Sequence, residues 1–452
     1  MRQFLLAAAA GVTVAASGFM AASAQDGLRE ALEADYDAHL HALYEHLHAN
    51  PELSFMETET AARMAEELRN AGFSVTENVG RTGVVAVMEN GEGPTVMLRA
   101  DMDALPMRED TPLEFASTVE AEDRMGNTFP VMHACAHDTH MAALVGAARW
   151  LGSNPDAWSG TLVLIAQPAE EVGLGAYAML ADGLYERFPT PDAVASFHTW
   201  GYMPAGEVRY VPGFAMANVD TVDLYVKGIG SHGASPHMGK DPVVIGAQIV
   251  NALQTLVSRE LSPFETGVVT VGAFNAGTKH NIISDEAHLQ ITVRSYTDEV
   301  RERLLSGIER IARGQAMAAG LPEELMPVME TEEVYTPAVY NDPAFSDQAG
   351  EALQNRFGER VDTADPVTGG EDFSRYGRTD EDVPIFMFWV GGAPDSVWEE
   401  YAARGETPPA NHSPFFWPDA EASILTGAEG LTVIALDVFE TGVESGPGAG
   451  AR

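Results

Sequence analysis

Residues 94–106, PTVMLRADMDALP, form a short apolar run that leads directly into two acidic residues, Asp101 and Asp103. A continuous apolar run of this length is typical of a strand buried on both faces of a sheet. Two further runs share the plan: residues 161–171, TLVLIAQPAEE, ending in Glu170 and Glu171, and residues 192–200, DAVASFHTW, whose strand we expect to end at His198. Sites in open α/β sheets form at the carboxyl ends of the strands. The three runs therefore predict an α/β fold with a polar site at one edge of its sheet.

The pattern changes near Asn218. An alternating run, DTVDLYVKG at 220–228, is followed by a helical segment, two strand-like runs and a second helical segment. This β-α-β-β-α order predicts an inserted two-layer domain with a helix pair on one sheet face. The first pattern resumes with the apolar run PIFMFWVGG at 384–392. We expect five segments: a signal peptide at 1–24, a main domain in two parts at 25–217 and 326–440, the insert at 218–325, and a disordered tail at 441–452.

Length and charge limit the possible functions. A chain of 452 residues is expected to fold as two or three domains. It has 26 Lys and Arg against 67 Asp and Glu, a formal net charge of −41. Such a charge argues against nucleic acids and anionic membrane surfaces as partners.

The first residues are typical of an export signal. Arg2 precedes the apolar run FLLAAAAGVTVAASGFM, and ASA at 22–24 is a cleavage pattern. The alternative is a membrane anchor that is kept, which the Ala-rich, weakly apolar run disfavours. We therefore expect a periplasmic or secreted protein.

The chain has a single cysteine, Cys135, in the stretch HACAHDTH at 133–140. In an oxidising compartment it cannot form an internal disulfide, so it is a buried spectator, a nucleophile or a metal ligand. In an extended stretch Cys135 and His137 would point the same way, with Asp138 or Thr139 capping the following helix. The alternative is a histidine-rich helix start that binds no metal.

Other polar residues favour the metal interpretation. Adjacent carboxylates such as Glu170 and Glu171 are costly after a buried strand unless a cation lies near. His198 closes one predicted strand, and His412 lies in NHSPFF at 411–416. An acid beyond a further strand, such as Asp103, is the kind of group that holds ligating imidazoles in place.

Several separated stretches resemble the metal-dependent amidohydrolase branch of the M20 peptidase family, which includes hippurate hydrolases, aminoacylases and auxin–amino-acid conjugate hydrolases. The stretches are LHANPELSF at 47–55, RADMDALP at 99–106, MHACAHDTHMAALVGAA at 132–148, QPAEEVGLGA at 167–176, GSHGASPH at 230–237, AGTKHNIIS at 276–284, GGEDFS at 369–374 and NHSPFF at 411–416. The resemblance implies a mixed-sheet catalytic domain of the zinc aminopeptidase and carboxypeptidase type. It also implies an inserted ferredoxin-like α+β domain that serves as a dimerisation lid.

The resemblance carries over to individual residues. It implies two divalent metal ions per subunit, Zn²⁺ first, with Mn²⁺, Co²⁺ or Ni²⁺ as alternatives. The matching metal ligands are Cys135, His137, Glu171, His198 and His412. Glu170 matches the general base, Asp103 the acid behind the centre, and His232 a histidine that in homodimers reaches the partner's site. Asn281 and Arg294 match, more loosely, positions that handle the substrate's carbonyl or carboxylate.

The chain departs from the family pattern at a few positions. Ala136 and Thr139 stand where Gly is usual, and Lys279 and His280 stand where small residues are commoner. None of these changes removes a ligand or the base, so we expect an active enzyme.

We therefore expect an exported metal-dependent amidohydrolase that cleaves N-acyl amino acids. One alternative is a dipeptidase or carboxypeptidase of the same family. Two others are a non-catalytic metal- or peptide-binding protein and a hydrolase with Cys135 as nucleophile.

Overall fold

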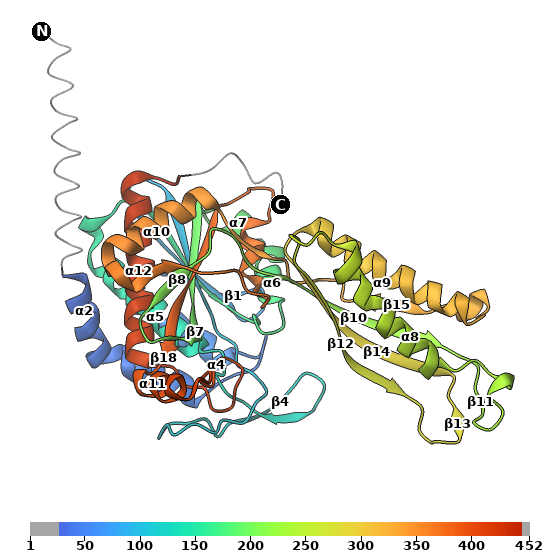
Figure 1. Cartoon of the computed structure of the whole chain (residues 1–452). Helices are drawn as coiled ribbons and strands as arrows, with labels where there is room; N and C mark the ends of the chain where they lie inside the picture. Colours follow the sequence, from blue (N-terminus) through green and yellow to red (C-terminus); the bar gives the residue numbers. More distant parts are fainter. Residues whose placement is uncertain (1–26, 445–452) are drawn as a thin grey trace, which may run out of the picture. The chain divides into compact units, whose positions relative to one another are not determined.

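The computed structural model describes residues 27–444 (Figure 1). The predicted signal peptide and most of the predicted tail lie outside the described residues. The chain divides into two compact units. Among the described residues, the unit that we expect to be catalytic, called the catalytic unit below, comprises 27–213, 340–365 and 372–444, and the insert comprises 214–339 and 366–371.

An eight-stranded mixed sheet forms the centre of the catalytic unit. Its strand order is β1 (Ser74–Val79), β2 (Gly83–Asn90), β6 (Gly160–Gln167), β3 (Thr95–Asp101), β7 (Ala193–Pro204), β18 (Ile385–Ala393), β8 (Val208–Tyr210) and β17 (Val361–Thr363). The four central strands, β6, β3, β7 and β18, run parallel. The pairs β1–β2, β2–β6 and β8–β18 are antiparallel, and β17 runs parallel to β8. Strands β3, β6 and β18 are buried along nearly their whole length. This agrees with the continuous apolar runs in the sequence.

Helices surround this sheet. They are α2 (Leu28–Asp35), a π-helical turn (Tyr36–Leu40), α3 (His41–Ala49), α4 (Thr58–Asn70), α5 (His137–Ser153), α6 (Gly175–Ala181), α7 (Leu184–Arg187), α10 (Pro343–Phe357), α11 (Asp395–Arg404) and α12 (Ala420–Thr441). Figure 1 shows α5 and α12 side by side against the sheet. Glycines let α12 lie close to the strands, because a Cβ at Gly427 would come within 2.3 Å of the Phe197 ring. A short hairpin, β4 (Glu120–Glu122) and β5 (Thr128–Pro130), projects from the loop before α5.

Helix α12 is long and apolar enough by composition to cross a membrane, but 89% of its most apolar window is buried inside the protein. A core helix passes the same test. We therefore assign α12 to the core of the catalytic unit.

The insert is a four-stranded antiparallel sheet with a helix pair on one face. Its strand order is β12 (Gly267–Ala276), β14 (Glu286–Ser295), β10 (Asn218–Lys227) and β15 (Val328–Thr331). Alternate residues of β10 and β14 are buried beneath α8 (Pro242–Thr255) and α9 (Asp298–Ala318). Two short strands, β11 (Ser231–His232) and β13 (Ile282–Ile283), form a separate antiparallel pair. In the sequence β11 follows β10, and β13 lies between β12 and β14. The mixed sheet and the two-layer insert confirm the predicted fold class.

The insert extends further than the predicted range of 218–325. Residues Val328–Thr331 pair with β10 and so form the fourth strand of its sheet. Their sequence, VMET, has too little apolar character to stand out as a strand. The chain crosses between the units near β9 (Gly213–Met216) and β16 (Val339–Asn341).

Candidate metal centre

The five predicted ligands and the predicted base lie together in the catalytic unit. Cys135 and His137 stand at the start of α5, Glu170 and Glu171 follow β6, His198 lies within β7, and His412 lies in the loop before α12. Within each of three groups, the donor atoms all lie within 4.8 Å of one another. The groups are Cys135, His137 and His198; Cys135, Glu171 and His412; and His137, Glu170 and Glu171. The groups share members, so they form one continuous site. Residues from four distant parts of the sequence therefore converge.

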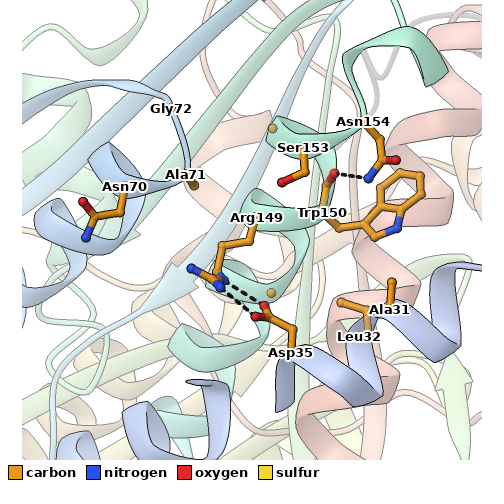
Figure 2. Close-up of a pocket in the computed structure, with 12 residues that line it drawn as sticks. Ala31, Leu32, Asp35, Asn70, Ala71, Gly72, Arg149, Trp150, Ser153 and Asn154 are labelled. Atoms are coloured by element: carbon orange, nitrogen blue, oxygen red, sulfur yellow. Dashed lines mark hydrogen bonds and ion pairs between the residues drawn. The ribbon is translucent and has the colours of Figure 1, made fainter. Parts of the chain in front are cut away.

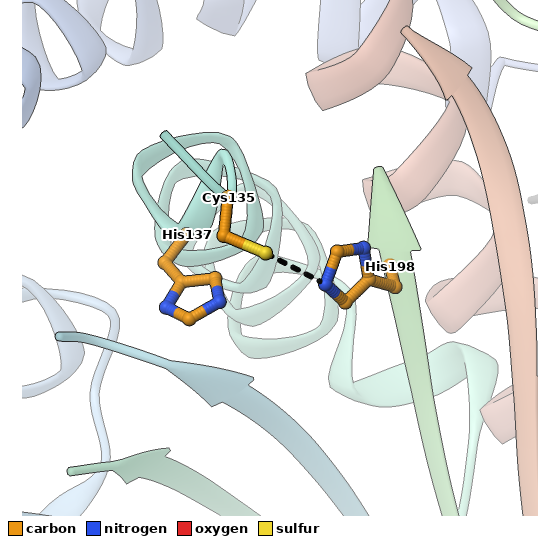
Figure 3. A group of neighbouring side chains, drawn as sticks. All are labelled: Cys135, His137 and His198. Atoms are coloured by element: carbon orange, nitrogen blue, oxygen red, sulfur yellow. Dashed lines mark hydrogen bonds between the residues drawn. The ribbon is translucent and has the colours of Figure 1, made fainter. Parts of the chain in front are cut away.

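Cys135 lies at the middle of this cluster. Its Sγ is 3.4 Å from Nε2 of His198 and 3.3 Å from Nε2 of His412. Figure 3 shows the Cys135 side chain directed from the start of α5 toward His198 on β7. The thiol therefore belongs to both overlapping groups of donors.

Backbone carbonyls set the orientation of two histidine rings. The Nδ1 of His137 lies 2.7 Å from the carbonyl oxygen of Asp103, and Nδ1 of His198 lies 2.8 Å from that of Thr199. A carbonyl only accepts, so in both rings Nδ1 carries a proton and Nε2 faces the cluster, where it can offer a lone pair to a metal. This is how proteins orient imidazoles that ligate metals.

The Asp103 carboxylate holds the loop that carries the two glutamates. Its Oδ1 accepts the backbone N–H of Glu170 at 2.9 Å, and its Oδ2 accepts that of Glu171 at 3.0 Å. Ser54 donates its hydroxyl to Oδ2 at 2.6 Å. Asp103 thus supports both His137, through its carbonyl, and the two carboxylates.

Two local predictions were wrong. The backbone around Cys135 is not extended, because Ala136 is left-handed with φ +66° and α5 begins at His137. The turn at Ala136, rather than strand alternation, brings Cys135 and His137 to one site. Asp138 and Thr139 lie inside the first helical turn and do not cap it.

Strand β7 also differs from the prediction, since it continues past His198 to Pro204. It does so because β18 pairs with it through Trp200. His198 therefore projects from within a strand rather than from its end.

A buried ionic network missed by the sequence analysis lies beneath the cluster. The Nδ1 of His140 is 2.6 Å from Oδ1 of Asp101, and the backbone N–H of Thr199 donates to Nε2 of His140 at 2.8 Å. Arg99, fully buried, donates to Asp101 Oδ2 at 2.6 Å. Both nitrogens of His140 are thus used in hydrogen bonds, so His140 supports the site and is not a free ligand.

A second missed group lies behind Asp138. The Nδ1 of His48 is 2.7 Å from Oδ2 of Asp138, and Nε2 of His48 is 3.0 Å from Oε1 of Glu109. All three side chains are buried. His48 occurs in the quoted stretch LHANPELSF, but nothing in a single sequence relates it to Asp138, which lies 90 residues away.

The electrostatics of the cluster call for a positive charge. Burial, partly offset by His137, raises the pKa of Glu171 to about 8. Burial alone would lower the pKa of His137, but the charge of Asp101 and the contacts with Asp103 and Glu171 raise it to about 10. In the protein alone, a proton on His137 therefore takes the place that a cation would fill.

Unsatisfied atoms show that the residues fit a metal. The Nε2 of His137 and Oε1 of Glu171 are buried without hydrogen-bond partners, and they lie 3.9 Å apart. This is close to twice a zinc–ligand distance of ~2.0 Å. The thiolate, imidazole and carboxylate donors would suit Zn²⁺ and related divalent ions, and the overlapping groups would suit a pair of such cations.

The three remaining predicted residues lie in the insert. His232 is exposed on β11, where its Nδ1 accepts the N–H of Ala234 at 3.0 Å, and Asn281 is exposed just before β13. Arg294 is half-buried near the far end of β14 and donates to Thr292 at 3.2 Å. Since β14 rises ~3.4 Å per residue, Arg294 lies more than ~25 Å along the strand from the end nearest Asn281. The insert therefore does not bring Arg294 together with the other two residues.

A separate pocket of about 480 Å³ lies between α2, α4 and the end of α5 (Figure 2). Its charged residues, Asp35 and Arg149, bind each other through two hydrogen bonds of 2.7 and 2.8 Å. Arg149 is twelve residues along α5 from His137, which corresponds to ~18 Å at 1.5 Å per residue. The pocket therefore has no part in the metal cluster.

The model of peptidase family M20/M25/M40 matches residues 97–435. N-acetylcysteine deacetylase of Bacillus subtilis is 34% identical over 397 residues, 87% of this chain and 95% of that protein. Hippurate hydrolase of Campylobacter jejuni is 37% identical over 330 residues, 72% of this chain and 82% of that protein.

Among solved structures, the YxeP protein of Bacillus subtilis, described as a dinuclear metal-binding peptidase of the M20 family, is 30% identical with a TM-score of 0.72. The match covers 90% of this chain and 99% of that one. A family match over most of the chain, together with the converging donors, leads to one conclusion: the chain belongs to peptidase family M20/M25/M40 and is a metal-dependent hydrolase of amide bonds.

Proposed function

We propose that this protein hydrolyses N-acyl amino acids, with Glu170 as general base beside a pair of divalent cations. The observation that carries the proposal is that one buried residue, Asp103, fixes the backbone of two adjacent carboxylates at the cluster. Asp103 holds the amides of both Glu170 and Glu171. Both carboxylates come within 3.9 Å of Nε2 of His137, and Glu171 in addition lies with the donors of Cys135 and His412.

The ligands of the proposed metal pair are Cys135, His137, Glu171, His198 and His412, and Zn²⁺ is the ion that this donor set favours. When bound, the ions polarise the amide carbonyl and acidify water near neutral pH. Glu170 takes a proton from the attacking water and returns it to the leaving amine. Asp103 keeps Glu170 in place while it does so.

Residues of the insert complete the proposed mechanism. His232 donates to the oxyanion that develops as water attacks, and such a donor contributes ~10²–10³-fold to the rate. Asn281 contacts the substrate carbonyl and Arg294 its carboxylate. Arg294 lies far along β14 from the end nearest Asn281 and His232. This distance supports a homodimer in which Arg294 serves one active site and the other two residues serve another.

The substrate class follows from relatives. N-acetylcysteine deacetylase and hippurate hydrolase are named for N-acyl amino acids, and both are similar to most of this chain. We further propose that the protein is exported to the periplasm or beyond, on the evidence of residues 1–24.

An assay of purified protein tests the proposed reaction. The substrates are N-acetyl and N-benzoyl amino acids, dipeptides and peptides with a free carboxyl end, each with chelator and with Zn²⁺, Mn²⁺, Co²⁺ or Ni²⁺ restored. We expect turnover of N-acyl amino acids, loss of turnover with chelator and recovery with metal. Turnover of dipeptides alone would replace the proposed substrate class by the peptidase alternative.

The base is tested by Glu170→Gln. The variant should keep its metal and lose activity by ~10³-fold or more, because the amide cannot accept the proton. Glu66→Gln, on the exposed side of α4, is the matched control. A Glu170→Gln protein with normal turnover would contradict the assignment. Activity in metal-free protein that alkylation of Cys135 abolishes would indicate a cysteine nucleophile.

A further inference from the structure

Glu57 is a buried carboxylate that the mechanism above does not use. Its side chain lies just before α4 and the residue is 0% exposed. Oε1 accepts two backbone N–H groups, from Phe55 at 2.7 Å and from Ala169 at 2.9 Å. Oε2 accepts the hydroxyl of Thr82 at 2.5 Å. The carboxylate therefore joins three distant parts of the catalytic unit.

Both amides on Oε1 come from residues with unusual backbones. Phe55 has φ +60° and Ala169 has φ +52°, in the left-handed region that side chains other than glycine rarely adopt. Such conformations persist only where the surroundings impose them. Here one carboxylate oxygen binds the N–H of both residues.

Ala169 directly precedes the proposed base. Three successive amides, those of Ala169, Glu170 and Glu171, each donate to a buried carboxylate. Glu57 accepts the first, and Asp103 accepts the second and the third. The backbone from which the Glu170 side chain leaves is thus fixed on both sides, and a displacement of ~1 Å at a reacting group can cost ~10²-fold in rate.

We propose that Glu57 is a positioning residue for amide hydrolysis, which holds Ala169 in its left-handed conformation and thereby directs the Glu170 carboxylate toward the metal cluster. The proposal rests on the proposed role of Glu170. A buried carboxylate is costly even when hydrogen-bonded, and an apolar side chain would fill the same space without that cost. The contact of Glu57 with Ala169, in the loop that carries Glu170, gives a functional reason for a carboxylate at this buried position.

Three variants of Glu57 test the proposal. Glu57→Ala should lower kcat by ~10²-fold while KM changes by less than ~3-fold and metal content stays at the wild-type level. Glu57→Asp keeps the charge but withdraws the oxygens by one methylene, and should lower kcat by ~10-fold. Burial and nearby Asp103 raise the pKa of Glu57 to about 7, so the neutral isostere in Glu57→Gln should restore kcat to within ~5-fold of wild type.

Glu52→Ala is the matched control. The Glu52 carboxylate also accepts two backbone amides, from Glu59 at 3.2 Å and Thr60 at 2.8 Å, but neither belongs to the loop of Glu170. It should lower thermal stability and leave kcat unchanged. If the Ala variant of Glu57 fails to fold, the Asp and Gln variants still decide the question. Equal kcat values for wild type and Glu57→Asp would overturn the proposal.

A double-mutant cycle shows whether Glu57 acts through Glu170. In a Glu170→Gln background, Glu57→Ala should cost less than ~2-fold, because the group that it positions is already inactive. A further full ~10²-fold loss would overturn the proposal and leave the base assignment intact. Normal activity of Glu170→Gln alone would overturn the base assignment and the positioning role with it.

Discussion

The surroundings of the two large sheets of this protein differ in how far their charged residues are buried. In the catalytic unit the sheet is buried on both faces, and the fully buried residues include Arg99 and Asp101 on β3 and His137 at the start of α5. In the insert the sheet is covered on one face. Ion pairs around it, such as Arg303 with Glu265, are largely exposed, although Asp220 on β10 is buried against Arg301. Buried charge is stable only with partners. The charges of the catalytic unit therefore form a network whose members depend on one another, whereas the exposed pairs of the insert should contribute little to stability.

The largest effect should follow removal of a ligand. His137→Ala should lower the metal content and reduce kcat/KM by more than ~10²-fold, because even residues that only support a ligand are worth 10–100-fold. In the insert, His288 pairs with Asp223 at 2.5 Å and stacks on Tyr225. His288→Ala should leave kcat/KM unchanged. Elemental analysis measures the metal content and steady-state kinetics measure kcat/KM. Equal losses in His137→Ala and His288→Ala would contradict the proposed difference between the two units.

The next largest effect should be on stability. Arg99→Met leaves the carboxylates of Asp101 and Asp372 buried without their guanidinium, and should lower the free energy of unfolding by ~3–5 kcal/mol. Arg303→Met should cost less than ~1 kcal/mol, because exposed pairs contribute little. Urea melts measure both. Tryptophan fluorescence follows the catalytic unit alone, since all six tryptophans lie within it, and circular dichroism follows the whole chain.

A third prediction concerns pH. Burial opposes protonation of His48, but hydrogen bonds to Asp138 and Glu109 raise its pKa to about 9. Since this lies above the unfolded value of ~6.5, its stabilisation is complete below pH ~6.5 and is lost as the pH rises toward 9, an effect of ~3 kcal/mol. His48→Gln should therefore be much less stable than wild type at pH 6 and similar to it at pH 9.5. A gap of constant size across that range would contradict the assignment.

The smallest predicted effect is the loss of stability when a helix cap is removed, and it should be the same in both units. Helices α8 and α10 each begin with Asp-Pro, and Asp241 and Asp342 accept backbone amides of the first turn at 2.9–3.0 Å. Each Asp→Ala change should cost ~1 kcal/mol, because a helix cap acts locally. Thermal melts of the two variants test this. A cost several times larger at Asp342 alone would show that local interactions, too, differ between the units.

The apolar runs were sufficient for the fold class, and the resemblance to the M20 family named the residues that meet at the cluster. Apart from Asp103, the sequence did not reveal the residues that support the cluster. Glu57 precedes an amphipathic helix and so resembles a solvated helix start, and His48 resembles an ordinary helical histidine. Their partners, Ala169 and Asp138, are 112 and 90 residues away. Only the folded chain shows such pairs.

Strand β15 was missed for a related reason. Its edge position in the insert requires few apolar residues, so its pattern is weak. The conformation of Ala136 was also beyond the sequence, since alanine gives no indication of a left-handed backbone.

Three loops at the cluster contain left-handed residues other than glycine: Ala136 beside two ligands, Ala169 beside the base, and His412 itself. A side chain at such a position narrows the range of shapes that a loop can adopt, compared with glycine. The protein without metal should thus already have the geometry of the loaded form. Uptake of cations would then be limited by how fast hydrated ions arrive and shed their water, and little by rearrangement of the chain.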